Sequence, residues 1–159
     1  MSSPTTTMFS FLLLLSVSLS YATPTVYEVL ESYGFPVGIL PKGATGYEIN
    51  EETGEFKVFL DQTCKFSIEG YDLEYKSTIS GVVSQNRITH LKGVSVRIFI
   101  LWLTIGEVRK TNHDLEFIVG IASASFPLDG FLESPTCGCG FDCDDDKKYV
   151  VDVSNLMSS

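Results

Sequence analysis

Residues 71–83 read YDLEYKSTISGVV, and this stretch decides the fold class of the chain. Apolar side chains such as Leu73, Tyr75 and Ile79 alternate along it with charged or hydroxyl-bearing side chains. Successive side chains of a strand point to opposite sides, so this alternation has the period of a β-strand with one buried face. The stretch therefore predicts one long strand of an antiparallel sheet.

The same period of two recurs on both sides of this strand. Turn residues separate the recurrences, which cover residues 46–50, 56–60, 64–68, 87–91 and 115–121. Sequential strands joined by short turns pair with their neighbours, so the pattern predicts an antiparallel meander. A final segment, residues 126–131, is expected to be irregular.

Residues 94–108 form the longest strand candidate. They begin with alternation and become apolar on both faces through residues 98–105. This apolar run is short and rich in β-branched and aromatic types, which favours a strand buried on both faces over a helix. A long sheet that contains such a strand is predicted to form a closed or nearly closed barrel.

A short helix is predicted before the sheet. Thr25 and Glu28 have the spacing of a capping box, T-x-x-E. The apolar residues that follow recur at helical spacing: Val26, Val29, Leu30 and Tyr33. Gly34 and Pro36 end the helix, and the connector 35–41 is expected to lie against the body. The predicted fold is all-β dominated, an antiparallel β-barrel-like meander of about seven strands with one short N-terminal amphipathic helix.

Residues 1–22 have the features of a secretory signal peptide. An apolar run covers residues 9–19, and Ser20-Tyr21-Ala22 matches a small-x-small cleavage site. The run is too short to cross a bilayer as a helix, which takes about 20 apolar residues. We therefore expect a signal peptide over 1–22, a β-barrel-like domain over 23–136 and a Cys/Asp-rich C-terminal tail over 137–159. The mature chain is expected to be secreted and to have no transmembrane segment.

The chain is acidic, with 20 Asp and Glu residues against 11 Lys and Arg residues and a formal net charge of −9. Nucleic acids and anionic membranes bind basic surfaces, so this charge argues against both as partners. The charge is compatible with cationic or neutral partners and does not distinguish between them.

Four cysteines lie in the predicted mature chain, namely Cys64, Cys137, Cys139 and Cys143. An even number of cysteines in an oxidising compartment predicts two disulfides. Four cysteines allow three connectivities, and the residue types alone do not choose among them. A long-range bridge has to use Cys64, because the other three cysteines form one cluster.

A series of motifs runs in order through residues 25–137. They are TVYEVL at 25–30, YGFPVGILP at 33–41, TGEFKV at 53–58, a lone Cys64, LEY at 73–75, ITHLKGVSV at 88–96, LWL at 101–103, F-x-x-G at 117–120 and SFP at 125–127. In order and spacing these motifs resemble the plant family called domain of unknown function 538. The resemblance covers nearly the whole predicted mature chain.

The resemblance implies an antiparallel β-barrel-like core, in a family of which many members look secreted, so the apoplast is the expected location. Suggested roles include lipid or lipopolysaccharide binding, by remote similarity to bactericidal/permeability-increasing proteins, and hydrolysis, including that of chlorophyll. Neither role brings a motif that can be assigned to residues of this chain. Because Cys64 and Cys137 both lie in the resembling region, their bridge is favoured. Cys139 and Cys143 would then form a small loop or stay free.

Five apolar or aromatic residues are candidates for lining a ligand cavity: Ile98, Ile100, Trp102, Phe117 and Tyr75. A barrel of minimal size is filled by its own side chains, whereas a slightly larger one holds a single apolar ligand. The same residues therefore also fit a packed core, and the interior volume decides between these interpretations. The expected partner is an apolar small molecule, and no cofactor is expected.

No motif for catalysis or metal binding stands out. The chain has no G-x-S-x-G elbow, and neither His90 nor His113 has the neighbours of a catalytic triad. The three tail cysteines have a spacing that zinc could use, but disulfides are expected in a secreted chain. The acidic cluster at 142–146 lacks the glycine and glutamate of a calcium-binding EF-hand loop and is interpreted as a solvated tail. We expect no catalytic residue and no metal.

These features are compatible with three functions, which differ in what they require of the structure. A binding module for a lipidic or amphipathic small molecule requires a cavity of about 300 Å³ or more. A surface-acting interaction or stress-related protein requires an exposed apolar patch or an open sheet edge. An apoplastic ester hydrolase requires a serine or carboxylate within hydrogen-bond reach of a histidine. The sequence favours the binding module.

Overall fold

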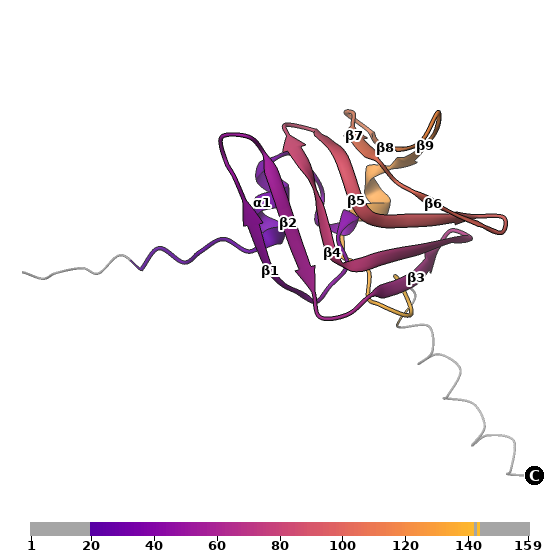
Figure 1. Cartoon of the computed structure of the whole chain (residues 1–159), viewed down its shortest axis with the longest axis horizontal. Helices are drawn as coiled ribbons and strands as arrows, with labels where there is room; N and C mark the ends of the chain where they lie inside the picture. The colour runs from indigo at the N-terminus through magenta and orange to yellow at the C-terminus, as the bar shows by residue number, and fades with distance from the viewer. Residues whose placement is uncertain (1–19, 142, 144–159) are drawn as a thin grey trace, which may run out of the picture.

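The computed structural model describes residues 20–141 and residue 143. In this part of the chain nine strands form one antiparallel sheet in the order β1-β2-β4-β5-β7-β8-β9, with β3 pairing β4 and β6 pairing β5 (Figure 1). The elements are α1 (Val26–Ser32), η1 (Val37–Ile39), β1 (Ala44–Ile49), β2 (Glu55–Leu60), β3 (Cys64–Ile68), β4 (Tyr71–Ser84), β5 (Arg87–Ile98), β6 (Leu101–Thr104), β7 (Glu107–Lys110), β8 (Asp114–Val119), β9 (Ala122–Pro127) and η2 (Leu128–Phe131). The predicted all-β fold with one short N-terminal helix is confirmed.

Helix α1 begins with the predicted capping box. The Thr25 hydroxyl accepts a hydrogen bond from the Glu28 backbone N–H at 3.2 Å, and the Thr25 backbone N–H donates to Glu28 Oε2 at 2.6 Å. Gly34 follows the helix with a φ of +85°, a left-handed conformation that glycine adopts at little cost. Val26 is buried and Leu30 packs against the core, so one face of the short helix is anchored on the sheet.

Strands β4 and β5 form the long centre of the sheet. Their pairing runs from Ser84 opposite Arg87 to Asp72 opposite Arg97, and its register shifts twice between Tyr75 and residue 82. Such bulges bend and twist a strand pair. The two register shifts therefore curve the sheet at its centre, within the pair formed by its two longest strands.

The sheet curls without closing. Its end strands, β1 and β9, do not pair with each other among the described residues. Instead, Tyr71 at the start of β4 meets Phe126 in β9 edge to face, with ring centroids 5.8 Å apart. The sheet is thus curved like part of a barrel but does not close, so the prediction of a closed barrel is wrong.

The prediction of a single strand over residues 94–108 is wrong, because β5, β6 and β7 divide this stretch. Ile98 pairs with Leu101, which leaves Phe99 and Ile100 as a two-residue turn. Neither residue is a usual turn former, so no glycine, proline or asparagine marks the break in the sequence. A run that is apolar on both faces fits a doubly buried strand and an exposed hairpin equally well, and tertiary context selects the hairpin.

The core lies between the curled sheet and the α1–η1 segment. Leu115 is fully buried, and Phe35, Ile79 and Val108 are nearly so. Phe35 belongs to the connector 35–41, which lies against the body as predicted.

Two disulfides join the four cysteines, Cys64 with Cys137 and Cys139 with Cys143. The first is the bridge that the family resemblance favours. Beside it, the Gly138 backbone N–H donates to the carbonyl of Lys65 at 2.7 Å, so the start of the tail lies along β3.

Most of the predicted signal peptide and most of the tail lie outside the described residues, which exclude 1–19, 142 and 144–159. Within the described ranges, no helix is long and apolar enough to cross a membrane.

An ion-pair cluster holds the short β5–β7 pairing together. Glu107 in β7 accepts hydrogen bonds from Arg109 Nε at 2.6 Å and from Arg87 Nε in β5 at 2.7 Å. Hydrogen bonds from the guanidinium groups of Arg109 and Arg87 hold the pKa of the Glu107 carboxyl below its usual value, and burial acts in the opposite direction. The folded chain therefore binds fewer protons at Glu107 than the unfolded chain does near the carboxyl pKa.

We expect Glu107→Gln to lower the free energy of unfolding at pH 7 by at most about 1 kcal/mol, because both arginines are half-exposed. Since the folded-state pKa is depressed, the contribution is present above the unfolded-state pKa of about 4.3 and is lost as the pH falls through the folded value. The free energies of unfolding of the unaltered chain and of Glu107→Gln should therefore approach each other as the pH falls. Urea unfolding of both proteins from pH 7 to pH 2.5 measures this change. Glu52→Gln, in the β1–β2 turn and without an ion pair among the described residues, is the control. A difference that grows on acidification would contradict the prediction.

Candidate functional site

A cavity of about 300 Å³ lies where the sheet curls over itself. Strands β3, β4 and β5 form one wall, β8 and β9 form the opposite wall, and Phe131 of η2 contributes from below. Only β7 lies between β5 and β8 in the strand order, and the two walls face each other because the sheet is curved. The volume lies at the lower end of the range of small-molecule sites.

Four aromatic rings run in series along this cavity. Tyr71 contacts Phe126 with centroids 5.8 Å apart, Phe126 contacts Phe117 at 5.9 Å, and Phe117 contacts Phe131 at 5.8 Å. All four residues line the cavity, and they come from β4, β9, β8 and η2. Aromatic faces and edges provide large apolar contact areas with little conformational freedom to lose on binding.

The cavity is electrically neutral. No Asp, Glu, Lys, Arg or His contributes to its lining, and among the lining residues only Tyr71, Tyr75 and Ser123 carry a polar side chain. The Tyr75 hydroxyl donates to the Ile39 carbonyl at 2.9 Å, and burial raises the pKa of this phenol, so Tyr75 stays uncharged. An ionised ligand would lose its hydration without finding a counter-charge, so the cavity suits uncharged apolar groups.

Two other spaces suit such a ligand less well. The space under α1 amounts to about 70 Å³ and lies within the core, too small for a ligand. An open groove of about 780 Å³ over β1, β2, β4 and β5 includes charged side chains, among them Glu48, Lys57 and Lys92.

The structure divides the five predicted lining residues. Tyr75, Ile98 and Phe117 line the 300 Å³ cavity, where they lie on three different strands. Ile100 and Trp102 do not contribute to it: their side chains are 83% and 45% exposed on the β5–β6 hairpin. Their expected inward position followed from the single-strand prediction for residues 94–108, which fails at the Phe99–Ile100 turn.

The contribution of β9 to the cavity is not among the sequence-based predictions. Residues 126–131 were expected to be irregular, but Phe126 is part of a strand that pairs with β8 along its whole length. Alternation of Ala122, Ala124 and Phe126 after the Gly120 turn is the signal that could have predicted this strand. Small side chains at 122 and 124 leave open the space that the cavity occupies.

The histidines and acidic groups form no catalytic constellation in the described part of the chain. His90 Nδ1 lies 3.2 Å from its neighbour Thr89 Oγ1, and this is the one hydrogen bond found for a histidine ring there. Among these residues, no three His, Cys, Asp or Glu side chains are grouped so that they could hold a metal ion. The acidic residues of the cluster at 142–146 lie outside the described residues.

The fold and its cavity define a small antiparallel β protein with a neutral apolar site and two disulfides. The family model described as "Protein of unknown function, DUF538" matches residues 26–132. The chain belongs to this family, which confirms the resemblance drawn from its motifs. It is also similar to the uncharacterized protein At5g01610 of Arabidopsis thaliana, with 26% identity over 95 residues that make up 59% of this chain and 55% of the relative. The chain thus spans about half the length of that curated relative.

Proposed function

We propose that this protein is a secreted, non-enzymatic binding module that holds one small apolar or amphipathic molecule in the 300 Å³ cavity. The observation that carries the proposal is the cavity itself, which is neutral and lined by four contacting aromatic rings. A binding pocket is typically concave, mostly apolar and supplied with a few polar groups that orient the ligand. The hydroxyl of Tyr71 supplies such a group for an amphipathic ligand.

Two features support secretion. Two disulfides join the four cysteines, and bridges of this kind persist in oxidising compartments. Residues 1–22 carry the signal-peptide pattern. No observation favours a hydrolase, because neither histidine ring is hydrogen-bonded to a carboxylate in the described residues.

The direct test is binding by residues 23–159 produced through an oxidising secretory route. We expect an organic extract of the purified protein to contain an apolar molecule at about one equivalent, detected by mass spectrometry. After extraction, the protein is expected to take up the neutral fluorophore N-phenyl-1-naphthylamine at one site. A protein that carries no ligand and takes up no fluorophore would refute the proposal.

Blocking the cavity should abolish uptake without unfolding the protein. Ala124 faces Phe117 across the β8–β9 pairing and is itself solvent-exposed, so a larger side chain there enters the cavity rather than the packed core. We expect Ala124→Trp to weaken fluorophore binding at least about tenfold. Ser125→Trp is the matched control, since Ser125 faces the other side of β9, opposite Glu116. Equal binding by both variants would place the fluorophore outside the cavity.

A further inference from the structure

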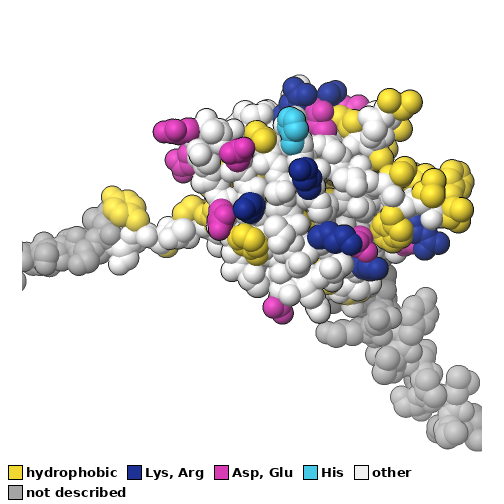
Figure 2. All heavy atoms as spheres, viewed as in Figure 1, with side chains coloured by type: hydrophobic (Ala, Val, Ile, Leu, Met, Phe, Trp, Pro, Cys, Tyr) yellow, Lys and Arg dark blue, Asp and Glu magenta, His cyan; other side chains and the backbone are white. Residues whose placement is uncertain are grey.

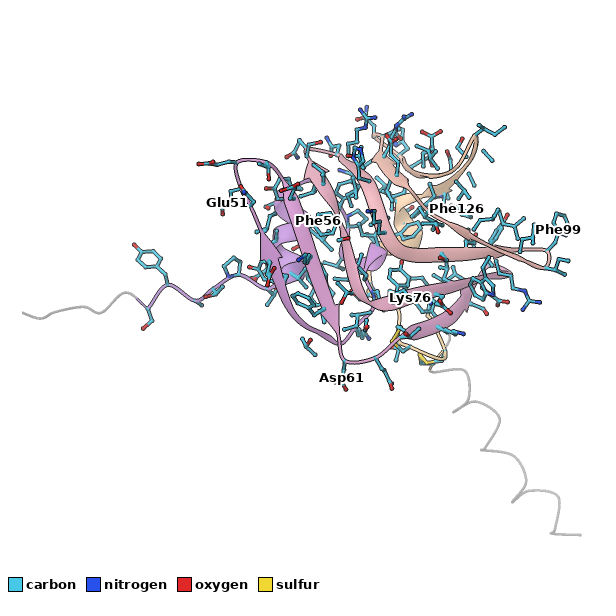
Figure 3. All side chains as sticks on the ribbon, viewed as in Figure 1. Glu51, Phe56, Asp61, Lys76, Phe99 and Phe126 are labelled. Atoms are coloured by element: carbon cyan, nitrogen blue, oxygen red, sulfur yellow. A yellow bond between two sulfur atoms is a disulfide. The ribbon has the colours of Figure 1, made fainter. Side chains whose placement is uncertain are left out.

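The most exposed large apolar side chains of the body stand on turns that border the cavity. Phe99 is 92% exposed and Ile100 83% exposed at the β5–β6 turn, and Ile121 is fully exposed at the β8–β9 turn. Figure 2 shows hydrophobic side chains gathered at one end of the molecule, and Figure 3 places Phe99 at the free end of its hairpin. The chain neighbours of these residues, Ile98 and Ala122, line the cavity, so the turns lie beside its opening.

The backbone at Phe99 adds a second observation. Phe99 has a φ of +56°, in the first position of a two-residue hairpin turn, where glycine is the usual residue. A bulky side chain in the left-handed region is rare because of steric conflict with its own backbone. Arg97 Nε donates to the Phe99 carbonyl at 3.2 Å and helps to hold the turn. Phenylalanine thus occupies a position that both water and backbone sterics disfavour, which is common where a residue serves binding.

A collar of amphipathic and charged side chains surrounds the hairpin behind its tip. Trp102 pairs with Arg97, two residues back from the turn on each strand, and the Lys65 ammonium lies 5.8 Å from the Trp102 ring centroid. At about 3.3 Å per residue, this level lies about 7 Å behind the tip. Interfacial segments bury their apolar side about 5–10 Å into a membrane surface. Tryptophan and snorkelling cations are typical of the headgroup level above such a segment.

The charges of this collar are of both signs, three cations against two anions. Lys65 pairs with Glu74 at 3.0 Å, Arg97 pairs with Asp72 at 3.4 Å, and Lys76 pairs with Glu74. The whole chain carries a net charge of −9, which opposes binding to an anionic surface. A collar of mixed sign on an acidic protein fits headgroups that themselves carry both signs.

We propose that the β5–β6 turn, together with Ile121 of the β8–β9 turn, docks the protein on a zwitterionic lipid surface. Docking rests on the exposed turns and their collar alone. Its consequence, that an apolar molecule passes between the lipid and the cavity without crossing water, rests on the proposed function. Apolar side chains that protrude from two turns can insert into a lipid interface at any lateral position, whereas a protein partner would need a matching pocket for each of them.

The chain contains one tryptophan, Trp102, so its intrinsic fluorescence reports on the hairpin. With residues 23–159 and vesicles of phosphatidylcholine alone, we expect a blue shift of the emission and flotation of the protein with the vesicles. The variant Phe99→Asn/Ile100→Ser should reduce the partition coefficient at least about tenfold. Asparagine suits the left-handed turn position, so this variant is expected to keep its fold. Leu132→Ser, which removes an apolar side chain that is 68% exposed outside both turns, should bind vesicles like the unaltered chain.

Binding of N-phenyl-1-naphthylamine in the absence of lipid separates this proposal from the proposed function. The hairpin variant should bind the fluorophore like the unaltered chain but bind vesicles weakly. Ala124→Trp should bind vesicles like the unaltered chain but bind the fluorophore weakly. No binding of the unaltered chain to phosphatidylcholine vesicles would overturn the docking proposal, as would binding that requires anionic lipid. The docking proposal would also be overturned if the unaltered chain bound no vesicles and formed a dimer in solution while the hairpin variant was monomeric. The partner of the turn would then be a second copy of the chain.

Discussion

Replacing Cys64 and Cys137 together by alanine is expected to lower the free energy of unfolding by about 4 kcal/mol. The bridge spans 73 positions of sequence, and in the chain-entropy model a longer closed loop restricts the unfolded chain more strongly. Cys64 is the first residue of β3, which among the described strands pairs only with β4 and lies off the main path of the sheet. Without the bridge, β3 keeps its pairing with β4, and the start of the tail is held to β3 by the Gly138–Lys65 hydrogen bond without a covalent link.

The matched control is Cys139→Ala/Cys143→Ala, which opens a loop of only 4 positions and should cost about half as much by the same model. Urea unfolding followed by circular dichroism measures both values. Ile68 at the end of β3 lines the cavity, so loss of the long bridge should also weaken fluorophore binding. Equal losses of stability in the two double variants would contradict the prediction.

Gly38→Ala is expected to lower the free energy of unfolding by about 1–3 kcal/mol. A Cβ at Gly38 would lie 2.3 Å from the Phe131 carbonyl oxygen and 2.6 Å from the Phe131 Cα, so backbone would have to move. Gly38 is buried in η1, where it packs against η2. Because Phe131 is also part of the cavity lining, the displacement should reduce fluorophore binding as well as stability.

Gly130→Ala is the control for this effect, since a Cβ there meets no atom within 4 Å although it precedes Phe131 directly. We expect this control to keep the stability and the fluorophore affinity of the unaltered chain. Thermal unfolding and a fluorophore titration of the two variants make the comparison. Unchanged binding in a destabilised Gly38→Ala protein would show that the η1–η2 contact does not shape the cavity.

The alternation that predicted the strands failed at its most hydrophobic part. Along β4 one face is buried and the other solvated, so the pattern records which way each side chain points. From Ile98 to Ile105 the positions of both strand faces are mostly apolar, so the sequence does not show which way each side chain points. An apolar residue exposed at a turn then cannot be distinguished from one buried in a strand. Trp102 and Ile100 were misplaced for that reason, while Tyr75 and Phe117, on well-alternating strands, line the cavity.

The sequence by itself determined the features that depend on near neighbours in the chain. These are the capping box of α1, the one-sided strands of an antiparallel sheet and the membership in the DUF538 family. Only the tertiary structure decided that the sheet stays open, that Phe99 and Ile100 form an exposed turn, and that a cavity of about 300 Å³ remains. The physical reason is that an interior volume depends on how strands far apart in sequence curve toward each other. That curvature brings Tyr71 of β4 into contact with Phe126 of β9, and no local pattern of the sequence records it.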